Sequence, residues 1–197
     1  MIIKAGSITN LTDARFFAAY DVDYIGFCFD PLSADYISPQ NALAIKGWIS
    51  GPKIVAEFAN QDIENVKNII AFFEPDVVEV QSSELRVQSS EFRVQGSEFR
   101  VQGSVFGVQD FGIPMIIKLP ADEFKEFKNE NCLFYLTDDF QFFQNSNPEI
   151  PFMLDITGKE IDFSNPKIKA IQIKGSQEFE VGVKDYDTIA DLLEKLS

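Results

Sequence analysis

The stretch IIKAGSITNLTDARFFAAYDVDYIGFCF (2–29) predicts a strand, a helix and a second strand in immediate succession. Its first five residues form a short apolar run, as expected of a buried strand. Asn10 or Thr12 can cap a helix over residues 11–20, where apolar side chains recur at helical spacing. The last seven residues of the stretch form another apolar run. A strand–helix–strand unit of this kind is typical of a parallel sheet.

The same alternation of strands and helices continues to the end of the chain. Six further strands are predicted at 53–59, 77–80, 114–119, 133–137, 152–156 and 169–174, and four further helices at 39–49, 62–73, 121–130 and 185–196. Eight strands separated by helical or helix-length segments predict a (β/α)8 barrel, built as a single small domain over residues 1–197. The alternative is an open doubly wound sheet, but no glycine-rich phosphate fingerprint follows the first strand.

A tandem repeat interrupts this pattern at residues 82–109, between the fourth and fifth predicted strands. The four copies read SSELRVQ, SSEFRVQ, GSEFRVQ and GSVFGVQ. Their apolar residues lie two positions apart, which does not fit the seam of a coiled coil. We therefore interpret the segment as an insertion produced by tandem duplication. The alternative is an adhesive edge formed by Phe92, Phe99 and Phe106.

Charge and composition exclude several classes of function. The net charge is −14, and Arg15 is the only arginine outside the repeats, so a nucleic-acid partner is not expected. The chain has no histidine, and Cys28 and Cys132 lack metal-ligand spacing, so neither a metal nor an organic cofactor is predicted. Neither a membrane span nor a secretory signal is recognisable, and we expect a cytoplasmic protein.

Three segments, ITNLTDA (8–14), YIGFCFDPLSADYISP (24–39) and GVKDYDTI (182–189), resemble the corresponding parts of phosphoribosylanthranilate isomerase, a small barrel enzyme of tryptophan biosynthesis. The resemblance covers the start and the end of the chain. It implies a (β/α)8 barrel with a ligand at its C-terminal mouth. It also implies a cofactor-free Amadori rearrangement of an aminoaldose phosphate to an aminoketose phosphate. As to assembly, we expect a monomer or a homodimer.

The chain departs from the family where the resemblance implies the general base. The family carries a cysteine at the end of its first strand, within a Lys-Ile-Cys-Gly-Ile-Thr-Asn-like motif. In this sequence Gly6 occupies the cysteine position, whereas Lys4 keeps its place and is assigned to ligand binding. Ser7 lies one position later, and its hydroxyl is a poor base unless another group activates it. Asp35 replaces an arginine of the family, and Gln81 replaces a histidine.

The resemblance also implies a general acid after the sixth strand and a phosphate site after the seventh and eighth. Counting strands assigns the acid to Asp138, with Asp139 and Asp155 as rivals. The expected phosphate-binding residues are Thr157, Gly158, Lys174, Gly175 and Ser176. Both glycines have an alternative interpretation as ordinary turn residues.

These observations predict a barrel protein of the phosphoribosylanthranilate isomerase type whose isomerase activity is lost or much reduced. One alternative is an active isomerase with an altered set of acid and base groups. A second is a pseudoenzyme that binds a small phosphorylated sugar or a protein. A third is a different barrel enzyme that uses Lys118, Lys174 or Glu79.

Overall fold

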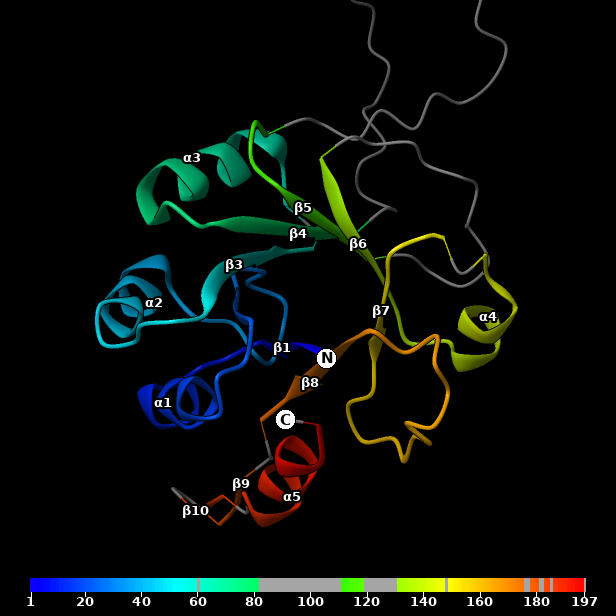
Figure 1. Ribbon diagram of the computed structural model, residues 1–197. Helices are drawn as coiled ribbons and strands as arrows, with labels where there is room; N and C mark the ends of the chain where they lie inside the picture. Colours follow the sequence, from blue (N-terminus) through cyan, green and yellow to red (C-terminus); the bar gives the residue numbers. More distant parts are fainter. Residues whose placement is uncertain are drawn as a thin grey trace, which may run out of the picture.

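The computed structural model describes residues 1–59, 61–81, 111–118, 131–147, 149–175, 178–180, 183–184 and 186–196, and its centre is a closed barrel of parallel strands (Figure 1). The strands are β1 (Ile2–Gly6), β2 (Tyr24–Cys28), β3 (Lys53–Phe58), β4 (Val77–Gln81), β5 (Met115–Lys118), β6 (Cys132–Thr137), β7 (Phe152–Asp155) and β8 (Ala170–Lys174). They pair in chain order, and β8 closes the ring on β1, with Gly6 opposite Lys174. The predicted barrel is confirmed, and its closure excludes the open doubly wound sheet.

Helices surround the barrel (Figure 1). They are α1 (Leu11–Ala19), α2 (Pro39–Lys46), α3 (Ile63–Phe73), α4 (Phe140–Asn145) and α5 (Asp187–Leu196). The sequence did not predict the small hairpin of β9 (Glu178–Glu180) and β10 (Val183–Lys184) that precedes α5. Residues 156–169, between β7 and β8, form turns rather than a helix. The helix predicted at 121–130 and the repeats at 82–109 lie outside the described residues.

Side-chain caps start the helices that follow β1, β2, β3 and β6. Asn10 is the N-cap of α1, because its Oδ1 accepts a hydrogen bond from the backbone N of Asp13 at 2.9 Å. Ser38, Asp62 and Asp139 cap α2, α3 and α4 in the same way. Each cap satisfies a backbone donor that the first turn of a helix leaves unpaired. These caps fix the points at which the chain leaves the mouth of the barrel.

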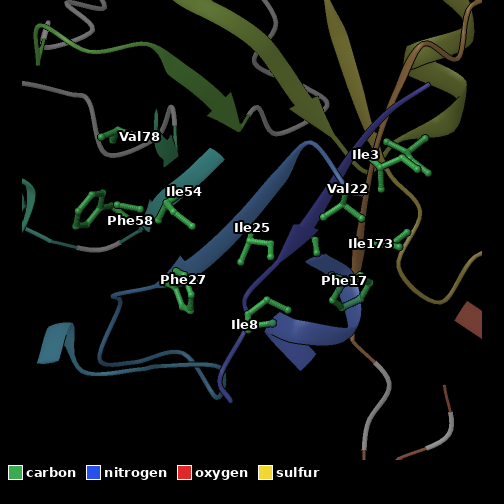
Figure 2. Close-up of a cluster of buried hydrophobic side chains, with 14 of the residues drawn as sticks. Ile3, Ile8, Phe17, Val22, Ile25, Phe27, Ile54, Phe58, Val78 and Ile173 are labelled. Carbon is green, nitrogen blue, oxygen red and sulfur yellow. The ribbon is translucent and has the colours of Figure 1, made fainter. Parts of the chain in front are cut away.

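The larger part of the hydrophobic core lies between the barrel and its helices. Figure 2 shows Ile3 of β1 and Ile25 of β2 in the same cluster as Phe17 of α1. Phe17 and Ile25 are fully buried. Burying one such side chain stabilises the fold by about 1.5–3 kcal/mol. This packing sets the strands in place and leaves their inward faces free to form a site.

A second, smaller core fills the inside of the barrel. Its buried members are Tyr24, Val55, Val77, Ile116, Leu136, Met153 and Ala170, which we call the apolar cluster. On several strands a polar residue follows an apolar one by two positions, so both side chains point to the same face. The pairs are Val55 and Glu57, Val77 and Glu79, Met153 and Asp155, and Ala170 and Gln172. Because the strands are parallel, the polar residues lie nearer the C-terminal mouth.

Candidate functional site at the barrel mouth

Lys4 is the centre of a buried polar cluster inside the barrel. Its Nζ lies 2.6 Å from Glu57 Oε1, 2.6 Å from Glu79 Oε2 and 2.5 Å from Gln172 Oε1. An ammonium group has three protons to donate, and these three partners use all of them. The Lys4 side chain is fully buried. We call Lys4, Glu57, Glu79 and Gln172 the charged cluster.

The charged cluster keeps Lys4 protonated. Burial is the largest single influence and acts to lower the pKa of Lys4, but the carboxylates of Glu57 and Glu79 outweigh it and raise that pKa above its usual value. Burial also raises the pKa of Glu79, with Lys4 opposing this effect and Glu57 adding to it. Since a charged amine is not a nucleophile, Lys4 is unsuited to covalent catalysis.

Two glycines make the space in which the Glu57 side chain lies. A Cβ atom at Gly26 of β2 would come within 1.9 Å of Glu57 Oε1, a distance that atoms do not tolerate. A Cβ atom at Gly6 of β1 would lie 3.3 Å from the same oxygen and 3.1 Å from Cδ of Gln172. Glu57 therefore extends from β3 across β2 to the end of β1. Its carboxylate lies beside the position where the resemblance implies the catalytic cysteine.

Ser7 holds this carboxylate from the other side. The Ser7 backbone N–H donates to both oxygens of Glu57, at 3.2 and 3.0 Å, and the Ser7 hydroxyl donates to Oε2 at 3.0 Å. Ser7 has a φ of 53°, in the left-handed region that residues other than glycine rarely adopt. A strained backbone of this kind persists only where surrounding contacts hold it, as the three contacts with Glu57 do here.

The polar network continues from the charged cluster to the loop after β7. Gln172 Nε2 donates to Asp155 Oδ2 at 2.9 Å, and Asp155 Oδ1 accepts from the backbone N of Thr157 at 3.0 Å. Asp155 is only 9% exposed. Among the three candidate acids, Asp155 is therefore the one whose carboxylate is hydrogen-bonded inside the barrel.

The other two candidate acids follow β6. Asp139 caps α4, since its Oδ1 accepts from the backbone N of Phe142 at 2.9 Å. Asp138 is exposed, and its backbone carbonyl accepts a hydrogen bond from Lys159 Nζ. The Asp138 carboxylate is therefore the most accessible of the three to a ligand.

Lys174 and Asp35 form an ion pair that links the end of β8 to the loop after β2. Lys174 Nζ lies 2.6 Å from Asp35 Oδ2, and each side chain is somewhat more than a third exposed. Burial tends to lower the pKa of Lys174, but the Asp35 carboxylate outweighs it and raises that pKa. The structure thus joins the residue expected to bind phosphate to Asp35, at the position where the resemblance implies an arginine.

The remaining phosphate-site candidates lie on two loops. Thr157 and Gly158 are exposed, and Gly158 has a φ of 69°, as its interpretation as a turn residue requires. A Cβ atom at Gly175 would lie 3.0 Å from Asp13 Oδ2, so a buried carboxylate lies against this loop. Asp13 also accepts a hydrogen bond from the Tyr186 hydroxyl. Ser176 lies outside the described residues.

Neither cysteine lies at the end of β1, where the resemblance implies the general base. Cys28 is buried at the end of β2, and burial raises the pKa of its thiol. Burial likewise raises the pKa of Cys132, to about 11. Both thiols are therefore protonated at neutral pH, whereas a thiol acts as a base or nucleophile only when ionised.

Sequence reasoning missed Glu57 and Gln172, although it singled out Lys4, Glu79 and Asp155. Each missed residue is a polar side chain within an otherwise apolar strand, in KIVAEF and AIQIK. Counting by twos along each strand from the apolar cluster would have placed both residues inside the barrel.

Two kinds of feature are absent from the part of the chain that the structure describes. Among those residues, no group of three or more histidine, cysteine, aspartate or glutamate side chains is arranged to hold a metal ion. Within the same residues, no helix is long and apolar enough to cross a membrane.

A closed parallel barrel with polar side chains gathered toward the carboxyl ends of its strands defines a class of proteins whose sites lie at that mouth. Within this class, the chain is similar to phosphoribosylanthranilate isomerases, as its sequence predicts. The curated N-(5'-phosphoribosyl)anthranilate isomerase of Thermotoga maritima is 32% identical over 85 residues, which are 42% of this chain and 40% of the relative. The match thus spans less than half of the relative's length. No family model matches the chain.

Solved structures of the same family share the fold over nearly the whole chain. The protein described as TrpF from Jonesia denitrificans has a TM-score of 0.71 at 15% identity, covering 98% of this chain and 95% of that one. A phosphoribosylanthranilate isomerase in complex with reduced 1-(o-carboxyphenylamino)-1-deoxyribulose 5-phosphate has a TM-score of 0.62 at 19% identity, covering 98% and 97%. The likeness to these structures supports the barrel fold.

Proposed function

We propose that this chain is a phosphoribosylanthranilate isomerase-like barrel protein whose isomerase activity is lost or much reduced, and that it binds a small phosphorylated sugar at the barrel mouth. The observation that carries the proposal is the absence of a side chain at Gly6, where the resemblance implies the cysteine base. A general acid or base commonly contributes 10²–10⁴-fold to a rate, so losing one leaves a feeble catalyst.

The charges at the mouth support the same proposal. The family substrate carries a carboxylate and a phosphate, whereas this mouth presents Asp35, with Asp155 close below the surface. The nearby cation Lys174 is already paired with Asp35. Bringing a dianionic ligand here requires Lys174 to exchange its partner, which weakens binding relative to a free cation.

For the ligand itself, we propose that the loops after β7 and β8 bind its phosphate through Thr157, Gly158, Lys174, Gly175 and Ser176. Asp138 remains our candidate general acid for any residual reaction, because its side chain is exposed at the end of β6. We no longer favour a direct ligand contact for Lys4, since its three protons are donated inside the barrel.

An isomerase assay with phosphoribosylanthranilate tests the loss of activity. We expect little or no turnover by the wild-type protein. Turnover should appear in Gly6→Cys, or in Gly6→Cys combined with Glu57→Ala, which makes room for the new sulfur. Robust wild-type turnover that Asp138→Asn abolishes would overturn the proposal in favour of an active isomerase with altered acid and base groups.

Thermal melting with inorganic phosphate and ribose 5-phosphate tests the binding part. A ligand at 100 times its Kd stabilises the folded state by about 2.7 kcal/mol, which raises the melting temperature measurably. Lys174→Met should reduce the shift, whereas Lys67→Met, a change on the exposed face of α3, should leave it unchanged. Equal shifts in both variants would argue against the proposed phosphate site.

We place this function in the cytoplasm, in the setting of tryptophan biosynthesis or of an offshoot from it, without a cofactor. The free thiols of Cys28 and Cys132 are compatible with a reducing compartment. Whether the protein is a monomer or a homodimer stays a prediction that sedimentation would test.

A further inference from the structure

We propose that Glu57 has taken over the position of the missing thiol and is the proton acceptor for whatever isomerisation the chain still performs, with Lys4 and Ser7 as positioning residues. The inference deepens the proposed function, on which it rests: it assigns the residual activity of that same mouth to one carboxylate. It starts from the geometry around Gly6.

The first argument is access to the position of the lost base. Glu57 belongs to β3, yet its carboxylate reaches the end of β1 because Gly26 of β2 offers no side chain to block it. Glu57 Oε1 lies 3.3 Å from the point where a Cβ at Gly6 would be. With hydrogen in place of a side chain at Gly6, Oε1 lies in the space that a side chain at position 6 would need, and Oε2 is directed to the next residue, Ser7.

The second argument is the orientation of the Glu57 carboxylate. A proton acceptor must be held in a defined position relative to the carbon that it deprotonates. The ammonium of Lys4 lies 2.6 Å from Oε1, and the Ser7 N–H donates to both oxygens. These contacts fix both carboxylate oxygens of Glu57, a residue that is only 6% exposed.

The third argument is that Glu57 Oε2 can free a lone pair to accept a proton when the Ser7 hydroxyl rotates. The Ser7 hydroxyl donates to Glu57 Oε2 at 3.0 Å, and a hydroxyl hydrogen rotates to suit its surroundings. When that hydroxyl turns away, Oε2 gains a free lone pair on the side of the partly exposed Ser7. The backbone N–H of Ser7 still holds the carboxylate in place during this change.

The proton transfer balances without any further reactant. In the protonated imine of an aminoaldose phosphate, Glu57 Oε2 takes the proton from the carbon next to the imine carbon. The electron pair of that C–H bond forms a C=C bond, while the C=N pair moves onto nitrogen and neutralises its charge. Glu57 becomes a neutral carboxylic acid. It returns its proton to the former imine carbon, which takes it with the C=C electron pair, while the O–H pair of the enaminol forms the C=O bond and the hydroxyl proton is released to water, replacing the proton that had charged the imine. Exchange of the Glu57 proton with water before this return introduces solvent hydrogen.

Deuterium incorporation measures this step more sensitively than product formation. Phosphoribosylanthranilate is incubated with protein in D₂O, and deuterium on the sugar carbons is followed by mass spectrometry. We expect wild-type incorporation above a protein-free control, a loss of about 10²-fold or more in Glu57→Gln, and partial recovery in Glu57→Asp. Glu64→Gln, an exposed glutamate of α3, is the matched control and should behave as wild type.

Gly6→Ala keeps every charge and tests the path itself. Its methyl group would lie 3.3 Å from Glu57 Oε1 and displace that carboxylate, so we expect incorporation to fall as in Glu57→Gln while circular dichroism shows an intact fold. This variant remains informative if Glu57→Gln does not fold. Wild-type incorporation no greater than the protein-free control overturns the inference and leaves the proposed loss of activity standing.

The proposed loss of activity and the proposed role of Glu57 can also be separated if the wild-type protein is active. Robust wild-type turnover that depends on Glu57 overturns the proposed loss of activity and supports the role of Glu57. Incorporation that is unchanged in folded Glu57→Gln and in Gly6→Ala overturns the role of Glu57, whatever the overall rate.

Discussion

The inside of the barrel combines two clusters that obey different rules. The apolar cluster, which includes Leu136 and Met153, excludes water and tolerates residues of similar volume. The charged cluster depends on matched partners, because a buried ion without its counter-charge is strongly unfavourable. The stability of the apolar cluster thus depends mainly on total side-chain volume, whereas that of the charged cluster depends on the identity of each residue. Gly6 lies against the charged cluster, because a Cβ atom there would come within 3.3 Å of Glu57.

Among the predicted effects on the two clusters, removal of the Lys4 ammonium should lower the free energy of unfolding the most. Lys4→Met leaves the carboxylates of Glu57 and Glu79 buried without their ammonium partner, and we expect a loss of about 3–5 kcal/mol in the free energy of unfolding. Urea unfolding measures it. Lys67→Met, which replaces an exposed lysine, should change stability by about 0.5 kcal/mol or less. A similar small change for Lys4→Met would show that the ion cluster contributes little.

A cavity in the apolar cluster should produce a somewhat smaller loss. Leu136 is fully buried, and Leu136→Ala removes its packing and leaves a void, at about 2–5 kcal/mol. Leu136→Met keeps most of the volume and should lose less than about 1.5 kcal/mol. If both variants lost the same free energy of unfolding, the apolar cluster would depend on residue identity as strongly as the charged cluster does. The contrast between the two clusters would then be wrong.

The pH dependence of stability separates the clusters in another way. Glu79 has a pKa raised above its ordinary value of 4.5, so the folded state keeps the proton to higher pH than the unfolded chain does. Glu79 therefore lowers the free energy of unfolding as pH rises from its ordinary pKa through its raised one. Glu79→Gln should remove this downward contribution, measured by urea unfolding across acidic to neutral pH. Parallel pH profiles for wild type and variant would contradict it.

The exposed ion pair at the mouth should have the smallest effect. Asp35 and Lys174 are each more than a third exposed, so a double-mutant cycle with Asp35→Asn and Lys174→Met should give a coupling of about 1 kcal/mol or less. The coupling should shrink further in high salt. A larger, salt-independent coupling would mean that this pair behaves like the buried cluster.

The strands were predictable because each is a short run of mostly apolar residues, as expected of a strand buried on both faces. All eight barrel strands lie within two residues of the predicted bounds, and the final helix, predicted at 185–196, is α5 at Asp187–Leu196. That Gly6 and Asp35 stand where the family carries a cysteine and an arginine stays a prediction from the resemblance, since it rests on the motif alone. The role of Gly26 was not predictable, since it depends on a side chain from the neighbouring strand.

The same reason explains why the partners of Lys4 were missed. Glu57, Glu79 and Gln172 are 53, 75 and 168 positions from Lys4 in sequence, and only the closure of the barrel brings them together. Burial and counter-charges are properties of that closed arrangement. They make Lys4 a buried structural cation, and no local sequence pattern carries this information.

The crossing of Glu57 over Gly26 couples positions 6 and 57. A cysteine at position 6 would press against Glu57 and Gln172, and a shortened side chain at position 57 would leave Lys4 with one carboxylate fewer. Each change alone is therefore expected to disturb the barrel interior, whereas a shorter residue 57 makes room for a larger residue 6. The two positions are expected to tolerate substitution only as a pair.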